Sequence, residues 1–181
     1  MLFARDTEIG LAAAAALVNT LDGDGEHLPD VAALDEFIST WGWTGKVEHS
    51  QAELQAVRDL RPRLRQIWEV DEEQVVEIVN DLLRTSNALP QLVKHDVWDY
   101  HLHATPPNAP LATRMAVEAA MAFVDVVRGK ELSRLRTCDY PGCDNVVVDL
   151  SKNRSKRFCD AGCGNKAAVA AYRARKAAAK N

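Results

Sequence analysis

Four cysteines constrain the fold of this chain more than any other feature, because all of them fall in the last quarter of its 181 residues. They form two close pairs, Cys138-x4-Cys143 and Cys159-x3-Cys163, with fifteen residues between the pairs. Two thiol pairs joined by a short loop can place four thiolates in a tetrahedron about one ion, as structural zinc sites do. The sequence therefore predicts one structural Zn²⁺ ion bound by these four cysteines.

Two other uses of four cysteines compete with a metal site. Disulfide bonds belong to oxidising compartments, whereas these thiols are clustered and the N-terminus MLFARDTEIG lacks the pattern of a signal peptide. Redox catalysis needs an exposed thiol of low pKa, and no sequence feature separates one cysteine from the other three. We therefore expect a cytoplasmic protein that is not an enzyme, because a closed four-sulfur site leaves no position for a substrate.

The charges of the chain are unevenly divided. The net charge is −4, but residues 1–129 hold 10 Lys and Arg against 21 Asp and Glu, whereas residues 130–181 hold 12 against 5. An acidic body followed by a basic tail indicates different partners for the two parts. No apolar run approaches the roughly 20 residues that a membrane helix needs, so we expect no membrane partner.

The acidic part, residues 1–129, shows mostly helical periodicity. The segment Ser50-Gln51-Ala52-Glu53 is a capping box, and the apolar stripe that follows it continues to Trp68. Pro62 lies inside that stripe and should kink the helix without ending it. A long apolar helix over residues 110–128 should run through the middle of the core. Further helices are expected over about 7–21, 30–41 and 71–85.

The periodicity changes from helical to strand-like after Leu89. In LPQLVKHDVWDYHLHA, Val97 is followed by Trp98, Tyr100 and Leu102 at a period of two, and KHD supplies a turn. This pattern predicts a β-hairpin of about 91–94 and 97–103. His101 and His103 would share one face of its second strand. They could bind a metal, although a pair of rim histidines is the simpler interpretation, because no carboxylate motif accompanies them.

Around the cysteines the residues predict a compact metal-binding fold. Pro141-Gly142 allows a tight turn within the first pair, residues 146–148 and 156–158 resemble two short strands, and a helix begins after Cys163. This order of pair, hairpin, pair and helix is treble-clef-like. The expected fold is therefore mainly α with a small β-hairpin, in which a helical N-terminal domain over 1–129 precedes a treble-clef-like zinc finger over 130–181.

The segment RLRTCDYPGCDNVVVDLSKNRSKRFCDAGCGNKAAVAAYRARK resembles the CGNR zinc finger, which stands at the C-terminus of proteins that carry an ABATE domain. The agreement covers Arg134-x-Arg136, the first cysteine pair, Asp149-x-Ser151-x-Asn153, Cys163-Gly164-Asn165 and the closing Tyr-Arg-x-Arg. One departure is Lys166, where the family name has Arg, which keeps the charge but loses bidentate geometry. The N-terminal part fits through VNTL, the capping-box helix and the apolar helix that leads into RLR.

This resemblance implies a bacterial stress-induced transcriptional regulator with four zinc ligands and DNA as its partner. The basic residues agree, since Lys and Arg displace the counterions condensed on DNA. On an ideal helix Lys166, Arg173 and Lys176 fall within about a quarter of the circumference. Asn165 could contact a base edge or cap the helix. The candidate nucleic-acid contacts are Arg134, Arg136, Lys152, Arg154, Lys156, Arg157, Asn165, Lys166, Arg173 and Lys176.

The leading hypothesis is a DNA-binding transcriptional regulator with a structural zinc finger. Its N-terminal domain would sense a small-molecule ligand or mediate formation of a homodimer. The alternative is a protein-interaction adaptor whose finger docks a protein partner. The basic tail could also be a solvated face, or could dock on the acidic body, because charge runs alone do not identify a partner.

Overall fold

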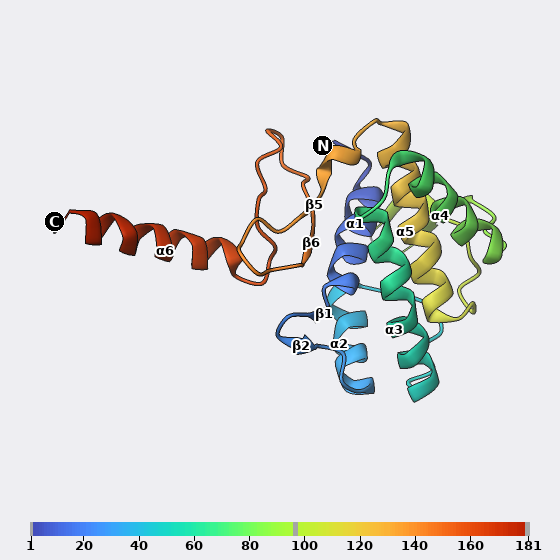
Figure 1. The fold of residues 1–181 in the computed structure, drawn as a ribbon. Coiled ribbons are helices and arrows are strands. Elements are labelled where there is room, and N and C mark those ends of the chain that lie inside the picture. The colour runs from blue at the N-terminus through green and yellow to red at the C-terminus, as the bar shows by residue number, and fades with distance from the viewer. Residues whose placement is uncertain (1, 96–97, 180–181) are drawn as a thin grey trace.

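The computed structural model describes residues 2–95 and 98–179 and confirms a mainly helical fold with small antiparallel sheets. Helices occupy one compact body, and the C-terminal segment extends from one side of it (Figure 1). The elements are α1 (Arg5–Val18), β1 (Leu21–Asp22), β2 (Gly25–Glu26), α2 (Val31–Trp41), α3 (Gln51–Arg65), η1 (Gln66–Trp68), α4 (Glu72–Thr85), β3 (Gln91–His95), β4 (Trp98–His103), α5 (Leu111–Arg128), η2 (Leu132–Arg134), β5 (Leu135–Thr137), β6 (Val146–Val148) and α6 (Cys163–Ala178).

Helix α5 forms the centre of the body, as its apolar sequence predicts. It packs against α1, α3 and α4 (Figure 1), and Phe123 in its middle is completely buried. Trp68 of η1 meets the Phe123 ring edge-on, with centroids 5.3 Å apart. Burial of these large apolar side chains supplies most of the favourable free energy of folding. No described helix has both the length and the hydropathy that a membrane span requires.

Three helices start at a residue whose side chain caps the first turn, and the sequence analysis named Ser50 among them. Asp30, Ser50 and Asp71 each accept a hydrogen bond from the backbone N–H three residues later, which satisfies one unpaired donor of the first turn. The capping box is only half formed, because the buried Glu53 carboxylate accepts from the N–H groups of residues 48 and 49 and not from that of Ser50. Helix α3 continues through the exposed Pro62, as expected.

Two hairpins lie in the described part of the body, and one of them was predicted from the sequence. The hairpin β3–β4 is present with a register shift between Val93 and His95, while Val97 of its predicted second strand lies outside the described residues. The short hairpin β1–β2 was missed, because the sequence analysis expected a helix over about 7–21 and no strand after it. The pKa of Glu26 in β2 is lowered to about 2, mainly by its hydrogen bonds from Arg61.

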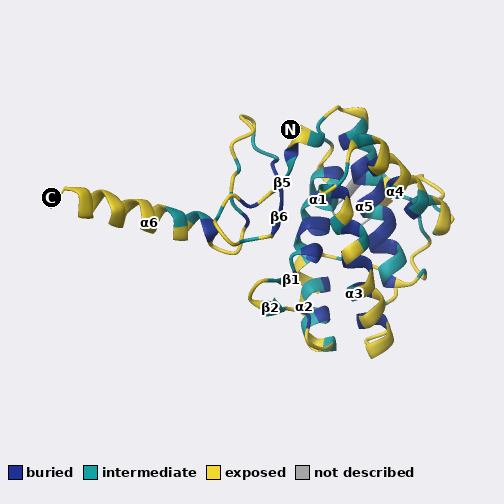
Figure 2. Cartoon of the chain, viewed as in Figure 1, coloured by how far each residue is buried: buried dark blue, intermediate teal, exposed yellow. Residues whose placement is uncertain are grey.

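Strand β6 joins the cysteine-rich segment to the helical body. Val146 and Val148 belong to the core of the body, whereas Val147 between them packs with Cys138, Cys159 and Cys163. Successive side chains of a strand point to opposite faces, so one three-residue strand contributes to two cores. All three valines are buried (Figure 2).

Polar contacts reinforce this junction. The Asn19 amide at the end of α1 donates to the Val146 carbonyl and accepts from the Val146 N–H, both at 2.8 Å, as a neighbouring strand would. The indole N–H of Trp68 donates to the Val147 carbonyl at 3.1 Å. The bonds from Asn19 satisfy the two backbone groups of Val146, which would otherwise be buried without a partner.

The prediction of a strand over residues 156–158 was wrong. Strand β6 pairs with β5, from Leu135↔Val148 to Thr137↔Val146, and residues 156–158 form no ladder. The backbone N–H of Lys156 donates to the Asp149 carboxylate at 3.0 Å. This N–H is therefore not available to a neighbouring strand. Side-chain bonds of this kind compete with regular secondary structure.

Candidate metal centre and nucleic-acid interface

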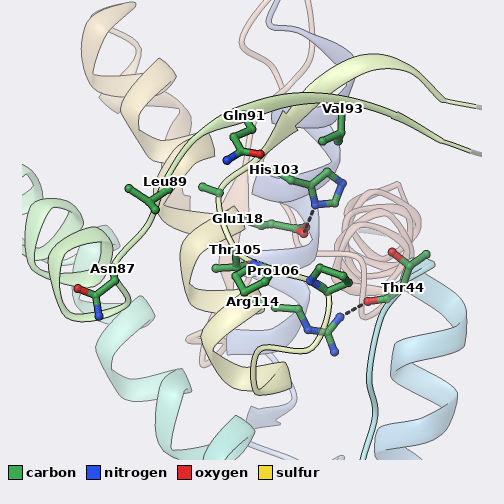
Figure 3. A pocket seen from close by; sticks show the side chains of 12 residues that line it. Thr44, Asn87, Leu89, Gln91, Val93, His103, Thr105, Pro106, Arg114 and Glu118 are labelled. Atoms are coloured by element: carbon green, nitrogen blue, oxygen red, sulfur yellow. Dashed lines mark hydrogen bonds and ion pairs between the residues drawn. The ribbon is translucent and has the colours of Figure 1, made fainter.

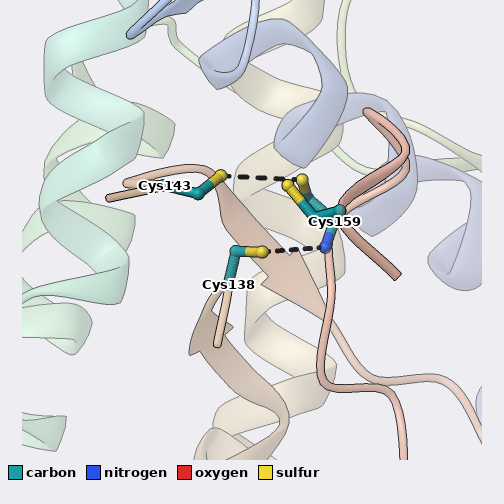
Figure 4. Close-up of side chains that lie close together, drawn as sticks. Cys138, Cys143 and Cys159 are labelled. Carbon is teal, nitrogen blue, oxygen red and sulfur yellow. Dashed lines mark hydrogen bonds between the residues drawn. The ribbon is translucent and has the colours of Figure 1, made fainter. Parts of the chain in front are cut away.

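The four cysteine sulfurs converge on one point. The Sγ atoms of Cys138, Cys143, Cys159 and Cys163 all lie within 4.8 Å of one another. Figure 4 shows the side chains of Cys138, Cys143 and Cys159 close together. Cys143 Sγ and Cys159 Sγ are 3.8 Å apart. Two sulfurs of a tetrahedral zinc site with bonds of about 2.3 Å are also separated by about 3.8 Å. The four cysteines therefore fit one zinc ion.

Hydrogen bonds fix the direction of two of these sulfurs. The Cys159 N–H donates to Cys138 Sγ at 3.3 Å, and the amide of Asn145 donates to Cys159 Sγ at 3.6 Å. Outer-shell bonds of this kind orient metal ligands and stabilise the thiolate form. Asn145 is almost completely buried, and the sequence analysis missed it. A buried amide beside a predicted ligand was not distinguishable from any other Asn in the cysteine-rich segment.

Each cysteine pair depends on a glycine directly before its second cysteine. Gly142 has φ = +78° and Gly162 has φ = +80°, a left-handed conformation that costs other residues free energy. Gly162 also precedes the first residue of α6, so the helix starts at the ligand Cys163. The two turns explain how spacings of four and three residues can close around the same ion.

The thiols also show why the site needs a cation. Burial raises the pKa of Cys143, and burial together with the three neighbouring thiols raises the pKa of Cys163 to about 12. Burial opposes ionisation of Cys159 as well, but the Ala161 N–H and other donors bring the pKa of that thiol below its usual value. Burial therefore opposes ionisation of Cys143 and Cys163, and a divalent ion would supply the charge that keeps all four sulfurs ionised.

Arg134 does not fit the predicted nucleic-acid surface. It is 4% exposed, and its guanidinium donates to Glu131 and to the carbonyls of Asp149 and Ser151. A phosphate could reach it only if these bonds broke. We therefore assign Arg134 a structural role, in which it ties the start of the finger to the loop after β6.

The loop after β6 is organised by Asp149, which is completely buried. Its carboxylate accepts from the N–H of Ser151 at 2.9 Å as well as from that of Lys156. Burial would raise the pKa of Asp149, but these bonds and the hydroxyl of Ser151 lower it. Asp149 and Ser151 of the Asp-x-Ser-x-Asn motif therefore hold together the loop that carries the basic residues.

The basic side chains of this loop are exposed or half-buried, and several form ion pairs. Arg154 binds Glu131 at 2.9 Å, Lys156 binds Asp160 at 3.0 Å and Arg157 binds Asp139 at 2.8 Å. Exposed pairs of this kind contribute little stability and can be exchanged for other partners. Lys152 is exposed, and Arg136 is half-buried near Asp149.

Helix α6 carries the other candidate contacts and leaves the body (Figure 1). Residues 168–179 are all exposed, and Asn165 and Lys166 are exposed near its start (Figure 2). At 1.5 Å per residue its 16 residues extend about 24 Å. The structure thus brings Asn165, Lys166, Arg173 and Lys176 onto one projecting helix that starts at the metal centre.

Two family models match the chain. The CGNR zinc finger matches residues 134–176, and ABATE, described as "Putative stress-induced transcription regulator", matches residues 11–130. Both agree with the resemblance drawn from the sequence motifs. No curated protein matches the chain.

Proposed function

Because the chain belongs to the ABATE family of transcription regulators and carries a CGNR zinc finger, we propose that it binds duplex DNA through α6 and the basic loop of the finger. Zinc would act as a structural ion that fixes the direction of α6. The body would sense a ligand or hold two copies together. This role requires no catalytic activity.

The projection of α6 is the observation that carries the proposal. Nearly all side chains of α6 are exposed, so this helix buries little apolar surface. Packing within this chain alone therefore does not explain why the helix is present. The sequence contains no Asp or Glu after Asp160, whereas Lys and Arg recur along the helix. A lone, positive helix is suited to the major groove, which is about 12 Å wide and admits one α-helix.

The faces of α6 differ in chemistry. At 100° per residue, Lys166, Arg173 and Lys176 lie on one stripe with Val169 among them and Tyr172 beside them. Val169 is 40% exposed and Tyr172 is 58% exposed. Basic groups and a tyrosine hydroxyl can bind phosphate oxygens, and an apolar side chain can contact a thymine methyl group. Asn165, in the first turn, is placed to reach a base edge.

A single finger offers a small interface. A module of this size buries about 600–1,000 Å² on DNA, which is at the low end for sequence-specific binding. We therefore propose that the protein binds as a homodimer, so that two helices read two half-sites.

Salt-dependent DNA binding tests the proposal directly. The zinc-loaded full chain should retard a short duplex at low salt, and Lys166→Gln and Arg173→Gln should each weaken binding. Each variant should also reduce the slope of log K against log salt by about 0.9, since one phosphate contact is lost. Lys46→Gln is the matched control, because Lys46 is exposed on the body and pairs with Glu48.

Two results would contradict the proposal. One is the absence of DNA binding by the zinc-loaded chain at low salt, where phosphate contacts are strongest. The other is an equal loss of affinity in Lys46→Gln, which would mean that net charge and not α6 determines binding. If DNA does not bind but the finger retains a protein through Val169 and Tyr172, the adaptor function replaces the regulator function.

A further inference from the structure

A cavity lies under the β3–β4 hairpin, far along the chain from the cysteines. It has a volume of about 690 Å³ and is bounded by the hairpin, the loop after it and one side of α5 (Figure 3). Much of its lining is apolar, including Leu89, Val93 and Pro106. A cavity of this size could admit a small molecule or several waters.

Arg114 has a structural role among the polar groups that line the cavity. Arg114 donates to the backbone carbonyls of residues 44, 46 and 109, so its guanidinium holds the surrounding loops together. His103 of β4 and Glu118 of α5 also line the cavity, and Figure 3 shows their side chains directed towards each other. His103 Nδ1 and Glu118 Oε1 are 3.9 Å apart.

His101 joins this pair from the same face of β4. Its Nε2 atom lies 2.9 Å from Nε2 of His103, and the ring centroids are 4.8 Å apart. The spacing of two residues along a strand puts both side chains on one face. The two Nε2 atoms thus share one hydrogen bond, and the Glu118 carboxylate lies near Nδ1 of His103.

We propose that His101 and His103 chelate one divalent transition metal ion through their Nε2 atoms. Two nitrogens bound at about 2.0–2.1 Å lie about 2.9 Å apart when the angle at the metal is 90°, and about 3.3 Å apart in a tetrahedron. The observed separation of 2.9 Å fits the right-angled geometry. Nickel and copper ions favour such tetragonal arrangements of nitrogen and oxygen ligands.

Glu118 acts as a positioning residue in this site. A carboxylate near Nδ1 favours the tautomer that carries its proton there, which leaves the Nε2 lone pair for the metal. Because the Nε2 atoms contact each other in the metal-free chain, one of them carries a proton. Metal binding releases this proton from Nε2, and Nδ1 of the same ring can take one up from water. The cavity leaves room for water or an exogenous ligand on the remaining positions.

Nickel titration of the zinc-loaded, tag-free full chain tests this site. Ni²⁺ is the probe because the cysteines already hold zinc and, unlike Cu²⁺, nickel does not oxidise thiols. We expect one nickel ion per chain by calorimetry, zinc retained after dialysis, and paramagnetic broadening of the NMR signals of the two histidines. His101→Gln and His103→Gln should each lower nickel affinity more than tenfold, since even an outer-shell change costs about 10–100-fold.

His49→Asn is the matched control, because His49 lies far along the sequence, pairs with Asp35, and has a φ of 51° that Asn tolerates. It should bind nickel as the original chain does. Glu118→Gln should retain binding at about 10–100-fold lower affinity. The proposal is overturned if the original chain binds no nickel beside its zinc, or if the His101 and His103 variants, with unchanged circular dichroism, bind as tightly as His49→Asn.

Discussion

Individual buried polar side chains hold the ends of the helices of this protein to other segments. Arg61 is 6% exposed and makes two hydrogen bonds with the Glu26 carboxylate, at 2.7 and 2.6 Å, and a third with Thr20. Asn19 completes the backbone bonding of β6 in the same region. Without the Glu26 carboxylate, the buried Arg61 guanidinium would lack its partner, and the fold would be destabilised. Breaking the pair therefore costs more stability than the intact pair contributes.

Replacement of Glu26 by Gln should make stability less dependent on acid pH. The folded-state pKa of Glu26 is lowered from 4.5 to about 2, chiefly by Arg61. Its contribution is therefore complete above about pH 4.5 and is lost as pH falls towards 2. Glu26→Gln should be less stable than the original chain at pH 7, and this difference should narrow between pH 4.5 and pH 3.

Urea unfolding at several pH values measures this effect. Glu36→Gln is the control, since Glu36 is exposed, and it should follow the original chain at every pH. Zinc is lost from all three proteins in acid, so the difference between proteins is the informative quantity. A constant difference for Glu26→Gln at all pH values would contradict the assignment.

The elements of the body follow from sequence patterns, and those around the cysteines only in part. Apolar stripes and capping residues such as Ser50 and Asp71 predict the helices because both act locally. The pairing of β6 with β5 could not be predicted from such local patterns. Leu135–Thr137 has no strong alternation of apolar and polar residues. In the competing segment 156–158, the Lys156 N–H is bound to the buried Asp149 carboxylate. Pairing between short strands depends on tertiary contacts that a local pattern does not contain.

Strand β6 should be the most sensitive element of the finger to a loss of side-chain volume. Val148 is 5% exposed and packs in the core of the body, so Val148→Ala should lower the free energy of unfolding by about 2 kcal/mol. Val169→Ala, on the exposed face of α6, should change it by less than about 0.5 kcal/mol. Urea unfolding of both variants with zinc present gives the comparison. Equal values would mean that the valines of β6 do not share the body's core.

In the whole molecule, the body and the finger share a strand. The division into a domain over 1–129 and a finger over 130–181 remains a prediction, and β6 crosses it by packing on both sides. The four candidate zinc ligands could be predicted from the sequence, because two cysteine pairs joined by a short loop can place four thiolates around one ion. The burial of Arg134 could not be predicted, since its partners are Glu131 and two carbonyls of the loop after β6, which only the folded chain brings together.

Removal of zinc should therefore destabilise the body as well as the finger. Metal-free cysteine-rich segments of this kind generally lose their fold, and here β6 would leave the core of the body. A chelator should lower the thermal midpoint of the whole chain and change tryptophan fluorescence, because Trp68 loses its bond to Val147. Added zinc should restore both signals.

Trp68→Phe serves as the control, and its fluorescence should change less on chelation. An unchanged thermal midpoint in the zinc-free chain would show that the body does not need the finger.

Helix α6 is held only at its first turn, where Cys163 is buried and the following residues are not. A rotation of such a helix about its first turn displaces its far end. With a length of about 24 Å, a rotation of about 10° at the metal centre moves its far end by about 4 Å, more than the rise of one base pair. Small changes at the β6 junction are thus amplified at the tip. In a homodimer, the angle at Cys163 would set the separation at which two half-sites fit.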